Sequence, residues 1–361
     1  MRIALLGDIA FFGMFSLKNN KTLYDYFKDI AELLSSYDLV IGNLETPFVT
    51  HAKSYGHKSA YIKSECENSA LLKYLNVDIV NLANNHIYDF GEAGYRSTID
   101  TLHEEGIKYF GVDTKEIIVE VDNNKIILNG YCCYSTNPLG IKSGEKGAIN
   151  ALDYATVAEK LESNKNEECL NILSVHCGQE HVNYPNYDHV RMARQLADIS
   201  PYVFYGHHPH VAQGTEIIKD SVLAYSLGNF CFDDVYTSKS DQPLIKQTQN
   251  NKESYVLDLT IENNKIVKHE MIPIFMREDK MLIGAPEISA KLKTYNEYLK
   301  LEEDVFVENR KAIIQSYIAS RKNARNLKWY LKRLNVSSFI QIKNARVNAK
   351  KYHDSIIKYL N

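Results

Sequence analysis

Short apolar runs recur along the chain, and most of them end abruptly in polar residues. The runs and the residues that follow them are IALL before Gly7-Asp8, LVI before Gly42-Asn43-Leu44-Glu45, VDIVNLA before Asn84-Asn85-His86, NILSV before His176, YVFY before residues 206–210, and SVLAYSL before Gly228-Asn229. Runs of this length that are apolar at successive positions are typical of strands buried on both faces.

Helical patterns lie between these runs. Thr22 precedes a segment whose apolar residues share one face, and residues 92–105 form a second helical segment that ends at Gly106. Strands and helices therefore alternate, which predicts an α/β fold with helices covering the sheets. Residues 123–124 and 262–264 separate further apolar runs and predict hairpins, so we expect mixed sheets.

The pattern changes near residue 285, beyond which the chain is helical in pattern and rich in lysine. Residues 310–361 hold thirteen Lys or Arg and one Asp, whereas the preceding residues hold 29 Lys or Arg and 44 Asp or Glu. We therefore predict a main domain at 1–285 and a basic helical extension at 286–361. The extension has two interpretations: a solvated face that docks on the acidic body, or a contact for anionic lipid or an acidic partner.

Composition narrows the class of protein. The six cysteines show no CxxC spacing, which argues against a disulfide framework and against a thiolate zinc site. The sequence contains no apolar run of 18 residues and no signal-peptide core, so we expect a cytoplasmic protein, with peripheral membrane contact as the alternative. The net charge of −3 gives no reason to expect a nucleic-acid partner.

The polar residues at the predicted strand ends form a candidate site, because the loops at the carboxyl ends of strands converge in α/β sheets. The candidates are Asp8, Asn43, Glu45, Asn85, His86, Asp89, His176, Glu180, His207, His208 and His210. Imidazole, carboxylate and carboxamide groups suit Mn, Fe or Zn. The residue before Pro209 is expected to be extended, which would fix His208. Lys53, Lys58 and Lys63 are expected to be solvated, with phosphate or carboxylate binding as the alternative.

Six motifs, in this order and spacing, resemble the CapA family of poly-γ-glutamate capsule synthesis proteins. They are GDIAFFG, GNLETPF, NLANNHIYDFGEAGYRSTIDTLHEEGI, SVHCGQEHVNYP, YGHHPHVAQGTEI and AYSLGNFCFD, and together they span roughly residues 1–235. The resemblance implies a fold similar to calcineurin-like metallophosphoesterases, in which helices flank a two-sheet αββα sandwich and two divalent metal ions bind at one edge.

The resemblance also implies roles for the candidate residues. Metal ligands would be Asp8, Glu45, Asn85, His176, His208 and His210. His86 would be the general acid and Asp89 its partner, and substrate contacts would come from Asn43, Glu180 and His207. Ala10 stands where the superfamily commonly has a histidine in its first motif, and Asn43 stands where it commonly has an aspartate in the second.

Three functions follow as expectations. The first is a metal-dependent, phosphoesterase-like hydrolase in capsule, surface-polysaccharide or polyglutamate biosynthesis. The second keeps the metal and acts on γ-glutamyl amides, by hydrolysis or transfer. The third is a non-catalytic metal-binding component of a polymer-synthesis complex. Expected partners are an anionic polymer or a phosphorylated precursor, and the basic extension is expected to meet a membrane surface or a polymer-synthesis partner.

Overall fold

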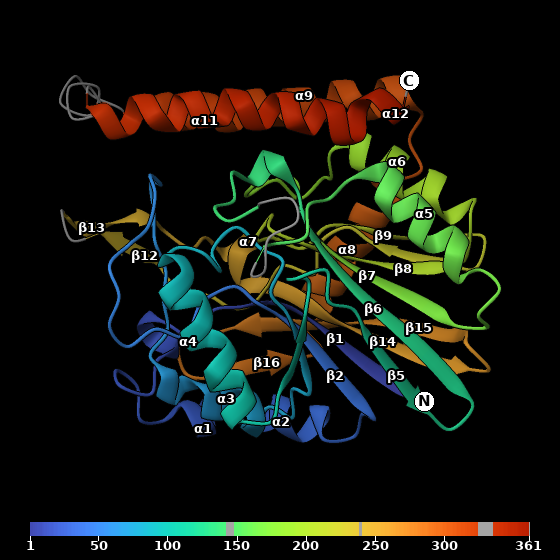
Figure 1. The fold of residues 1–361 in the computed structure, drawn as a ribbon, viewed down its shortest axis with the longest axis horizontal. Helices are drawn as coiled ribbons and strands as arrows, with labels where there is room; N and C mark the ends of the chain where they lie inside the picture. The colour runs from blue at the N-terminus through green and yellow to red at the C-terminus, as the bar shows by residue number, and fades with distance from the viewer. Residues whose placement is uncertain (142–147, 238–239, 324–334, 361) are drawn as a thin grey trace.

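Two β-sheets packed face to face form the body of the protein (Figure 1). The computed structural model describes residues 1–141, 148–237, 240–323 and 335–360. The first sheet has the order β16-β15-β14-β1-β2-β3-β4, with β11 paired to β1. Its strands are β1 (Arg2–Ile9), β2 (Leu39–Leu44), β3 (Ile79–Asn81), β4 (Lys108–Phe110), β11 (Asn229–Cys231), β14 (Glu253–Glu262), β15 (Lys265–Met276) and β16 (Met281–Ile283).

The second sheet has the order β5-β6-β7-β8-β10-β9. Its strands are β5 (Ile117–Val121), β6 (Asn124–Cys132), β7 (Leu170–His176), β8 (Tyr202–His207), β9 (Thr215–Ile218) and β10 (Ser221–Ala224), and a separate ribbon pairs β12 (Val235–Thr237) with β13 (Ser240–Ile245). Strands β1, β2, β3 and β4 run parallel to one another, as do β6, β7, β8 and β10. The carboxyl ends of these strands therefore gather at one edge of each sheet.

Alternating side chains of the central strands build separate hydrophobic layers. Ile3 and Leu5 of β1 point between the sheets, where they join Leu128 of β6 and Val203 of β8. Ala4 and Leu6 of β1 point the other way and pack under helices. Both faces of each sheet are thus covered, which explains why the strands are apolar at successive positions.

Helices cover the outer faces. The first sheet carries α1 (Leu23–Tyr26), α2 (Lys28–Leu34), α3 (Ser69–Tyr74) and α4 (Gly91–Glu104), and the second carries α5 (Tyr154–Asn164) and α6 (Tyr187–Ala197). Shorter elements are η1 (Gly13–Phe15), η2 (Cys66–Asn68), η3 (Tyr134–Thr136) and α7 (Gln249–Lys252). The predicted α/β two-sheet sandwich with helices on its outer faces is confirmed.

Two local predictions are confirmed and one needs correction. α4 ends before Gly106, whose φ of +72° is in the left-handed region, and the hairpins β5–β6 and β14–β15 form at the predicted turns. The helix expected after Thr22 is two helices, interrupted at Phe27. The Thr22 hydroxyl donates to Asn20 Oδ1 and does not cap the helix, because its backbone, with φ −99° and ψ 13°, lacks the extended geometry of a capping residue.

The C-terminal part consists of α8 (Pro286–Tyr298), α9 (Glu303–Asn323), α11 (Val336–Tyr352), the π-helical turn η4 (His353–Ile357) and α12 (Lys358–Leu360). Figure 1 shows α9 and α11 along one end of the sandwich. Ile288 of α8 packs into the core between the sheets, and Phe306 and Ile356 pack over the second sheet. The domain division at 285 stays a prediction, and residues 324–334 of the extension lie outside the described residues. Among the described helices, none is both long enough and apolar enough to cross a membrane.

Candidate functional site

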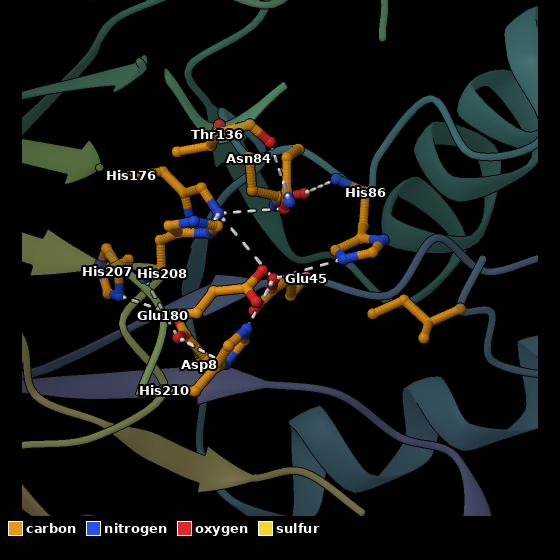
Figure 2. A network of polar contacts seen from close by, with 12 residues as sticks. Asp8, Glu45, Asn84, His86, Thr136, His176, Glu180, His207, His208 and His210 are labelled. Atoms are coloured by element: carbon orange, nitrogen blue, oxygen red, sulfur yellow. Dashed lines mark hydrogen bonds and ion pairs between the residues drawn. The ribbon is translucent and has the colours of Figure 1, made fainter. Parts of the chain in front are cut away.

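The predicted polar residues meet where the carboxyl ends of β1, β2 and β3 approach those of β7 and β8 (Figure 2). Asp8, Glu45 and His176 are fully buried, and His208 and His210 are 4% and 7% exposed. Glu180 and His86 are the partly exposed members of the set, and the Glu180 carboxylate points toward the others (Figure 2). The expected convergence of strand ends is therefore observed, whereas the metal, catalytic and substrate roles stay predictions.

Asp8 lies at the centre of a dense hydrogen-bond network. Its Oδ1 accepts from Asn43 Nδ2 at 2.8 Å and lies 3.1 Å from His207 Nδ1. Its Oδ2 lies 3.4 Å from His210 Nδ1 and accepts from the backbone N–H of His208 at 3.4 Å. Burial alone would raise the pKa of Asp8, but the hydrogen bonds from His207 and His210 hold that pKa well below its usual range. Asp8 is therefore a permanent carboxylate.

A relay of amides fixes the orientation of Asn43. The backbone N–H of Ala83 donates to Asn81 Oδ1 at 3.0 Å, and Asn81 Nδ2 donates to Asn43 Oδ1 at 3.0 Å. A backbone N–H is only a donor, so each amide in the relay has one consistent orientation. Asn43 therefore presents its NH₂ group to Asp8, and its oxygen is already occupied.

Glu45 is the least satisfied carboxylate of the site. Both of its oxygens are buried and form no hydrogen bond with any described residue. Three imidazole nitrogens face Oε1: Nε2 of His210 at 3.7 Å, Nε2 of His176 at 3.8 Å and Nε2 of His86 at 3.9 Å. Burial raises the pKa of Glu45 to about 8, although nearby His210 opposes the shift. A buried polar atom without a partner indicates a missing ligand.

The histidine loop supplies the nitrogen donors. Ligand atoms of Glu45, His208 and His210 all lie within 4.8 Å of one another. Burial lowers the pKa of His208 to about 4. Burial acts in the same direction on His210, but the Glu45 and Asp8 carboxylates outweigh it and raise the pKa of His210 to about 10. A protonated His210 thus takes the place of a cation between two acids, and this donor set fits a divalent metal.

The backbone of this loop differs from the expectation. His208 has φ of +95° and His210 has φ of +57°, so both lie in the region that favours glycine. The expected extended geometry before Pro209 is wrong for φ, because the loop must turn both rings toward one point. Strain of this kind persists only where surrounding contacts hold it, and here His208 N–H to Asp8 and His210 Nδ1 to Asn229 Oδ1, 2.9 Å apart, do so.

His176 and Asn85 lie beside Glu45 and contact each other. His176 Nε2 lies 3.1 Å from Asn85 Oδ1 and 3.2 Å from His208 Nδ1. Burial, and then the neighbouring His208, hold the pKa of His176 well below its usual range, so its imidazole is neutral. A neutral imidazole and a carboxamide oxygen are both able to bind a metal ion.

His86 lies on the opposite side of Glu45 and belongs to a second cluster. Its Nδ1 lies 2.7 Å from Asp89 Oδ2, and since a carboxylate accepts, Nδ1 carries the proton. Lys58 Nζ donates to Asp89 Oδ1 at 2.6 Å and to the Asn85 carbonyl at 2.7 Å. Burial lowers the pKa of His86, Asp89 opposes this and Lys58 adds to it, so His86 presents an unprotonated Nε2 toward Glu45.

Three predicted substrate contacts differ in their placement. Asn43 is fully buried with both ends of its amide bonded, and His207 is 1% exposed and packs on the Tyr205 ring, so neither placement supports a substrate contact. His207 Nε2 is also buried and has no hydrogen bond with the described residues. Glu180 alone among the three combines exposure with an orientation toward the site (Figure 2).

Sequence reasoning missed Asn81 and Asn229 and did not distinguish Lys58 from two other loop lysines. The expectation that Lys58 is solvated is wrong, because its side chain is only 11% exposed and pairs with the Asp89 carboxylate. Asn229 follows an apolar run as the ligand candidates do, so that signal was present in the sequence. Asn81 lies inside β3, and nothing in the pattern distinguishes it.

Comparisons with known proteins agree on one family. The family model described as "Bacterial capsule synthesis protein PGA_cap" matches residues 2–234. The PGA biosynthesis protein CapA of Bacillus subtilis is 29% identical over 229 residues, which cover 61% of this chain and 60% of that protein. The capsule biosynthesis protein CapA of Bacillus anthracis is 26% identical over 273 residues, which cover 72% of this chain and 66% of that protein. The chain thus spans less than two thirds of the length of either relative.

Solved structures are more distant. A hypothetical protein from Thermus thermophilus aligns with a TM-score of 0.45 at 16% identity, covering 79% of this chain and 100% of that one. The NAD nucleotidase of Haemophilus influenzae aligns with a TM-score of 0.44 at 14% identity, covering 86% of this chain and 60% of that one. Because the family model matches well over half of the residues, the chain belongs to the PGA_cap family of bacterial capsule synthesis proteins.

Proposed function

We propose that this protein is a metal-dependent hydrolase of phosphoesters that acts in the biosynthesis of a capsule or a related surface polymer. The observation that carries the proposal is Glu45, whose two buried oxygens have no hydrogen-bond partner among the described residues while three imidazoles face it. The biological setting is supported by the family and by two relatives that are named for PGA and capsule biosynthesis.

The cation would be held first by Glu45, His208 and His210, with Asp8, Asn85 and His176 beside them. A divalent ion supplies Lewis-acid polarisation of a phosphoryl oxygen and lowers the pKa of water. The sequence led us to expect two ions. The Asn43 amide, which turns a donor toward Asp8, favours one tightly held ion at the Glu45 side.

His86 is proposed to move the proton. Because Nδ1–H is bonded to Asp89, a neutral His86 accepts a proton at Nε2 from the attacking water as the new O–P bond forms. The old P–O bond breaks on the opposite side of the phosphorus, in line with the attacking oxygen, so the departing oxygen takes its proton from water, and His86 acts as a general base in place of the expected general acid. Lys58 compensates the charge of Asp89, and the partly exposed Glu180, whose carboxylate points toward the site, is the proposed substrate contact.

The proposal is tested on purified protein with Mn²⁺ and an aryl phosphodiester. Glu45→Gln should weaken Mn²⁺ binding by about 100-fold or more, because it removes the charged ligand. His86→Ala should leave Mn²⁺ binding within about threefold and lower the rate by about 10²–10⁴-fold. His269→Ala, on the exposed face of β15, is the matched control and should change neither. Hydrolysis that survives His86→Ala, or Mn²⁺ binding that survives Glu45→Gln, would contradict the proposal.

A second candidate is a non-catalytic metal-binding component of a polymer-synthesis complex. It is favoured by Ala10, which packs in an apolar cluster with Ile62, Phe232 and Val235 and offers no ligand. Tight Mn²⁺ binding that depends on Glu45, with no hydrolysis of phosphodiesters, would support this candidate. Release of glutamate from a γ-glutamyl chain would support the amide-hydrolase alternative instead.

A further inference from the structure

The last long helix, α11, exposes its apolar side chains to solvent. Val336, Phe339, Ile342 and Val347 are 73%, 63%, 53% and 46% exposed. At 100° per residue these positions fall within about 140° of one another around the helix. One side of α11 is therefore apolar at four positions and faces away from the body.

The opposite side of α11 faces the protein and is mostly polar, although Ile340 is half-buried and Tyr352 packs against the core at the last turn. Ser337 Oγ lies 3.1 Å from His57 Nδ1, and Asn348 Nδ2 donates to Asn137 Oδ1 at 3.3 Å. A helix on the surface of a globular protein normally shows the reverse, with its apolar stripe against the core. α11 thus exposes more of its large apolar side chains than it covers, which is expected where the outer face has an apolar partner of its own.

The same outer side is basic. Lys343, Arg346 and Lys350 are exposed and lie between the apolar positions around the helix. Residues 310–361 contain only one acidic residue, Asp354, which lies beside His353. The positive charge of this surface is therefore opposed by a single acidic residue on its own segment.

We propose that the outer face of α11 docks this protein on the surface of an anionic phospholipid bilayer. Phe339 and Ile342 would enter the boundary between headgroups and acyl chains, while Lys343 and Arg346 extend to the phosphates. An acidic polymer would match the charge but would leave the apolar side chains in water. A bilayer with anionic headgroups matches both, so the interleaved pattern favours lipid.

Docking through α11 would place the candidate site close to the membrane. Ser337 contacts His57, next to Lys58 of the His86 cluster. On α9, the Tyr317 ring lies 6.2 Å from that of His181, which lies 6.3 Å from the His210 ring. The helices therefore border the site. This inference does not depend on the proposed reaction.

The test is co-sedimentation of the full chain with vesicles of phosphatidylcholine alone and of phosphatidylcholine with phosphatidylglycerol. We expect binding to the anionic vesicles only, and weaker binding at high salt. Phe339→Ser with Ile342→Ser, and separately Lys343→Glu with Arg346→Glu, should each reduce binding by about tenfold or more. Unchanged thermal unfolding would show that the exposed substitutions leave the fold intact.

The matched control is Val267→Ser with Lys268→Glu on β15. Val267 is 53% exposed and Lys268 is equally a surface cation, but both lie on the sheet, away from α11. This variant should bind vesicles as the unchanged protein does. Equal binding to neutral vesicles, unchanged binding by both α11 variants, or binding of a soluble polyglutamate without vesicle binding would overturn the proposal.

Discussion

Glu45 and Asp89 are carboxylates of equal burial in the same site, yet their surroundings are opposite. Both are fully buried. Asp89 accepts hydrogen bonds from Lys58 at 2.6 Å and from the backbone N–H of Ile62 at 2.9 Å, and lies 2.7 Å from His86 Nδ1. Glu45 has no hydrogen bond with the described residues.

The difference appears in the pKa values of the two acids. For both, burial acts to raise the pKa. His86 and Lys58 outweigh it for Asp89, whose pKa is lowered, whereas the pKa of Glu45 is raised to about 8. Asp89 thus has a hydrogen-bonded cation within the protein, whereas Glu45 has no hydrogen-bonded partner among the described residues and faces the His210 imidazole only at 3.7 Å. The protein satisfies one buried acid internally and leaves the other for a ligand from outside.

The difference between Asp89 and Glu45 is tested most strongly by removing Lys58, the cation that compensates Asp89. Lys58→Met leaves Asp89 buried without compensation, and we expect the free energy of unfolding of the metal-free protein to fall by about 3–5 kcal/mol. Denaturant unfolding measures this change. Glu45→Gln, by contrast, removes a buried acid that has no partner, so it should leave the stability of the metal-free protein unchanged or raise it.

Lys53→Met is the matched control for that experiment. Lys53 lies in the same loop but is exposed, so its substitution should change stability by about 0.5 kcal/mol or less. The double variant Lys58→Met, Asp89→Asn removes both charges of the pair and should recover part of the lost stability. A loss of similar size for Lys53 and Lys58 would show that the buried pair is unimportant.

The position of Glu45 and the pairing of Asp89 with His86 could be foreseen from the sequence, and the pairing of Asp89 with Lys58 could not. Glu45, His176 and His208 follow apolar runs, and strand ends converge for geometric reasons that hold in any parallel sheet. Lys58 lies in the segment between β2 and α3, which has little regular structure, and only long-range folding brings it to Asp89.

The orientation of side chains and backbone at the site also depends on contacts that the sequence does not show. The apolar runs predicted an α/β fold with helices covering the sheets, and the resemblance to the CapA family implied the two-sheet sandwich. The sequence could not give the direction of the Asn43 amide, which depends on a hydrogen bond from Asn81 on the next strand. Nor could it give the left-handed φ at His208, since the preference before proline is local and the contact with Asp8 is not.

Protons should compete with the metal at Glu45 and not at Asp89. The pKa values of Glu45 and His210 are both raised, and the two shifts are linked, because the charge of the Glu45 carboxylate raises the pKa of His210. The pair therefore holds at least one proton near pH 7 that a metal ion must displace. We expect the release of about one to two protons per ion, and an Mn²⁺ affinity that rises by about 10- to 100-fold per pH unit. Calorimetry in buffers of different ionisation enthalpy measures the proton count.

In the metal-free protein, the stability of the fold depends on pH in the opposite direction from the Mn²⁺ affinity. Because both pKa values are higher in the folded than in the unfolded chain, the folded state binds more protons between pH 6.5 and 8, and stability should fall as the pH rises through this range. The melting temperature should therefore decrease with pH in metal-free protein, and the stabilisation by Mn²⁺ should increase. Proton release that is unaffected by Glu45→Gln would argue against Glu45 as the site of competition.

The smallest expected effect concerns Asn43. Its amide determines whether Asp8 is satisfied within the protein, as Asp89 is, or needs a cation from outside, as Glu45 does. Asn43 Nδ2 now donates to Asp8 Oδ1 at 2.8 Å and so satisfies that acid internally. Asn43→Asp replaces the donor by a second carboxylate, which leaves two adjacent acids that need a cation. We expect Mn²⁺ binding to increase from about one to about two ions per chain, with a gain in affinity of about tenfold for the added ion.

Equilibrium dialysis with elemental analysis measures the stoichiometry. Asn171→Asp is the matched control, because Asn171 is equally buried but bonds Asn164 at the far end of β7. Two ions in the unsubstituted protein, or no added ion in Asn43→Asp, would show that the amide does not limit metal binding at Asp8.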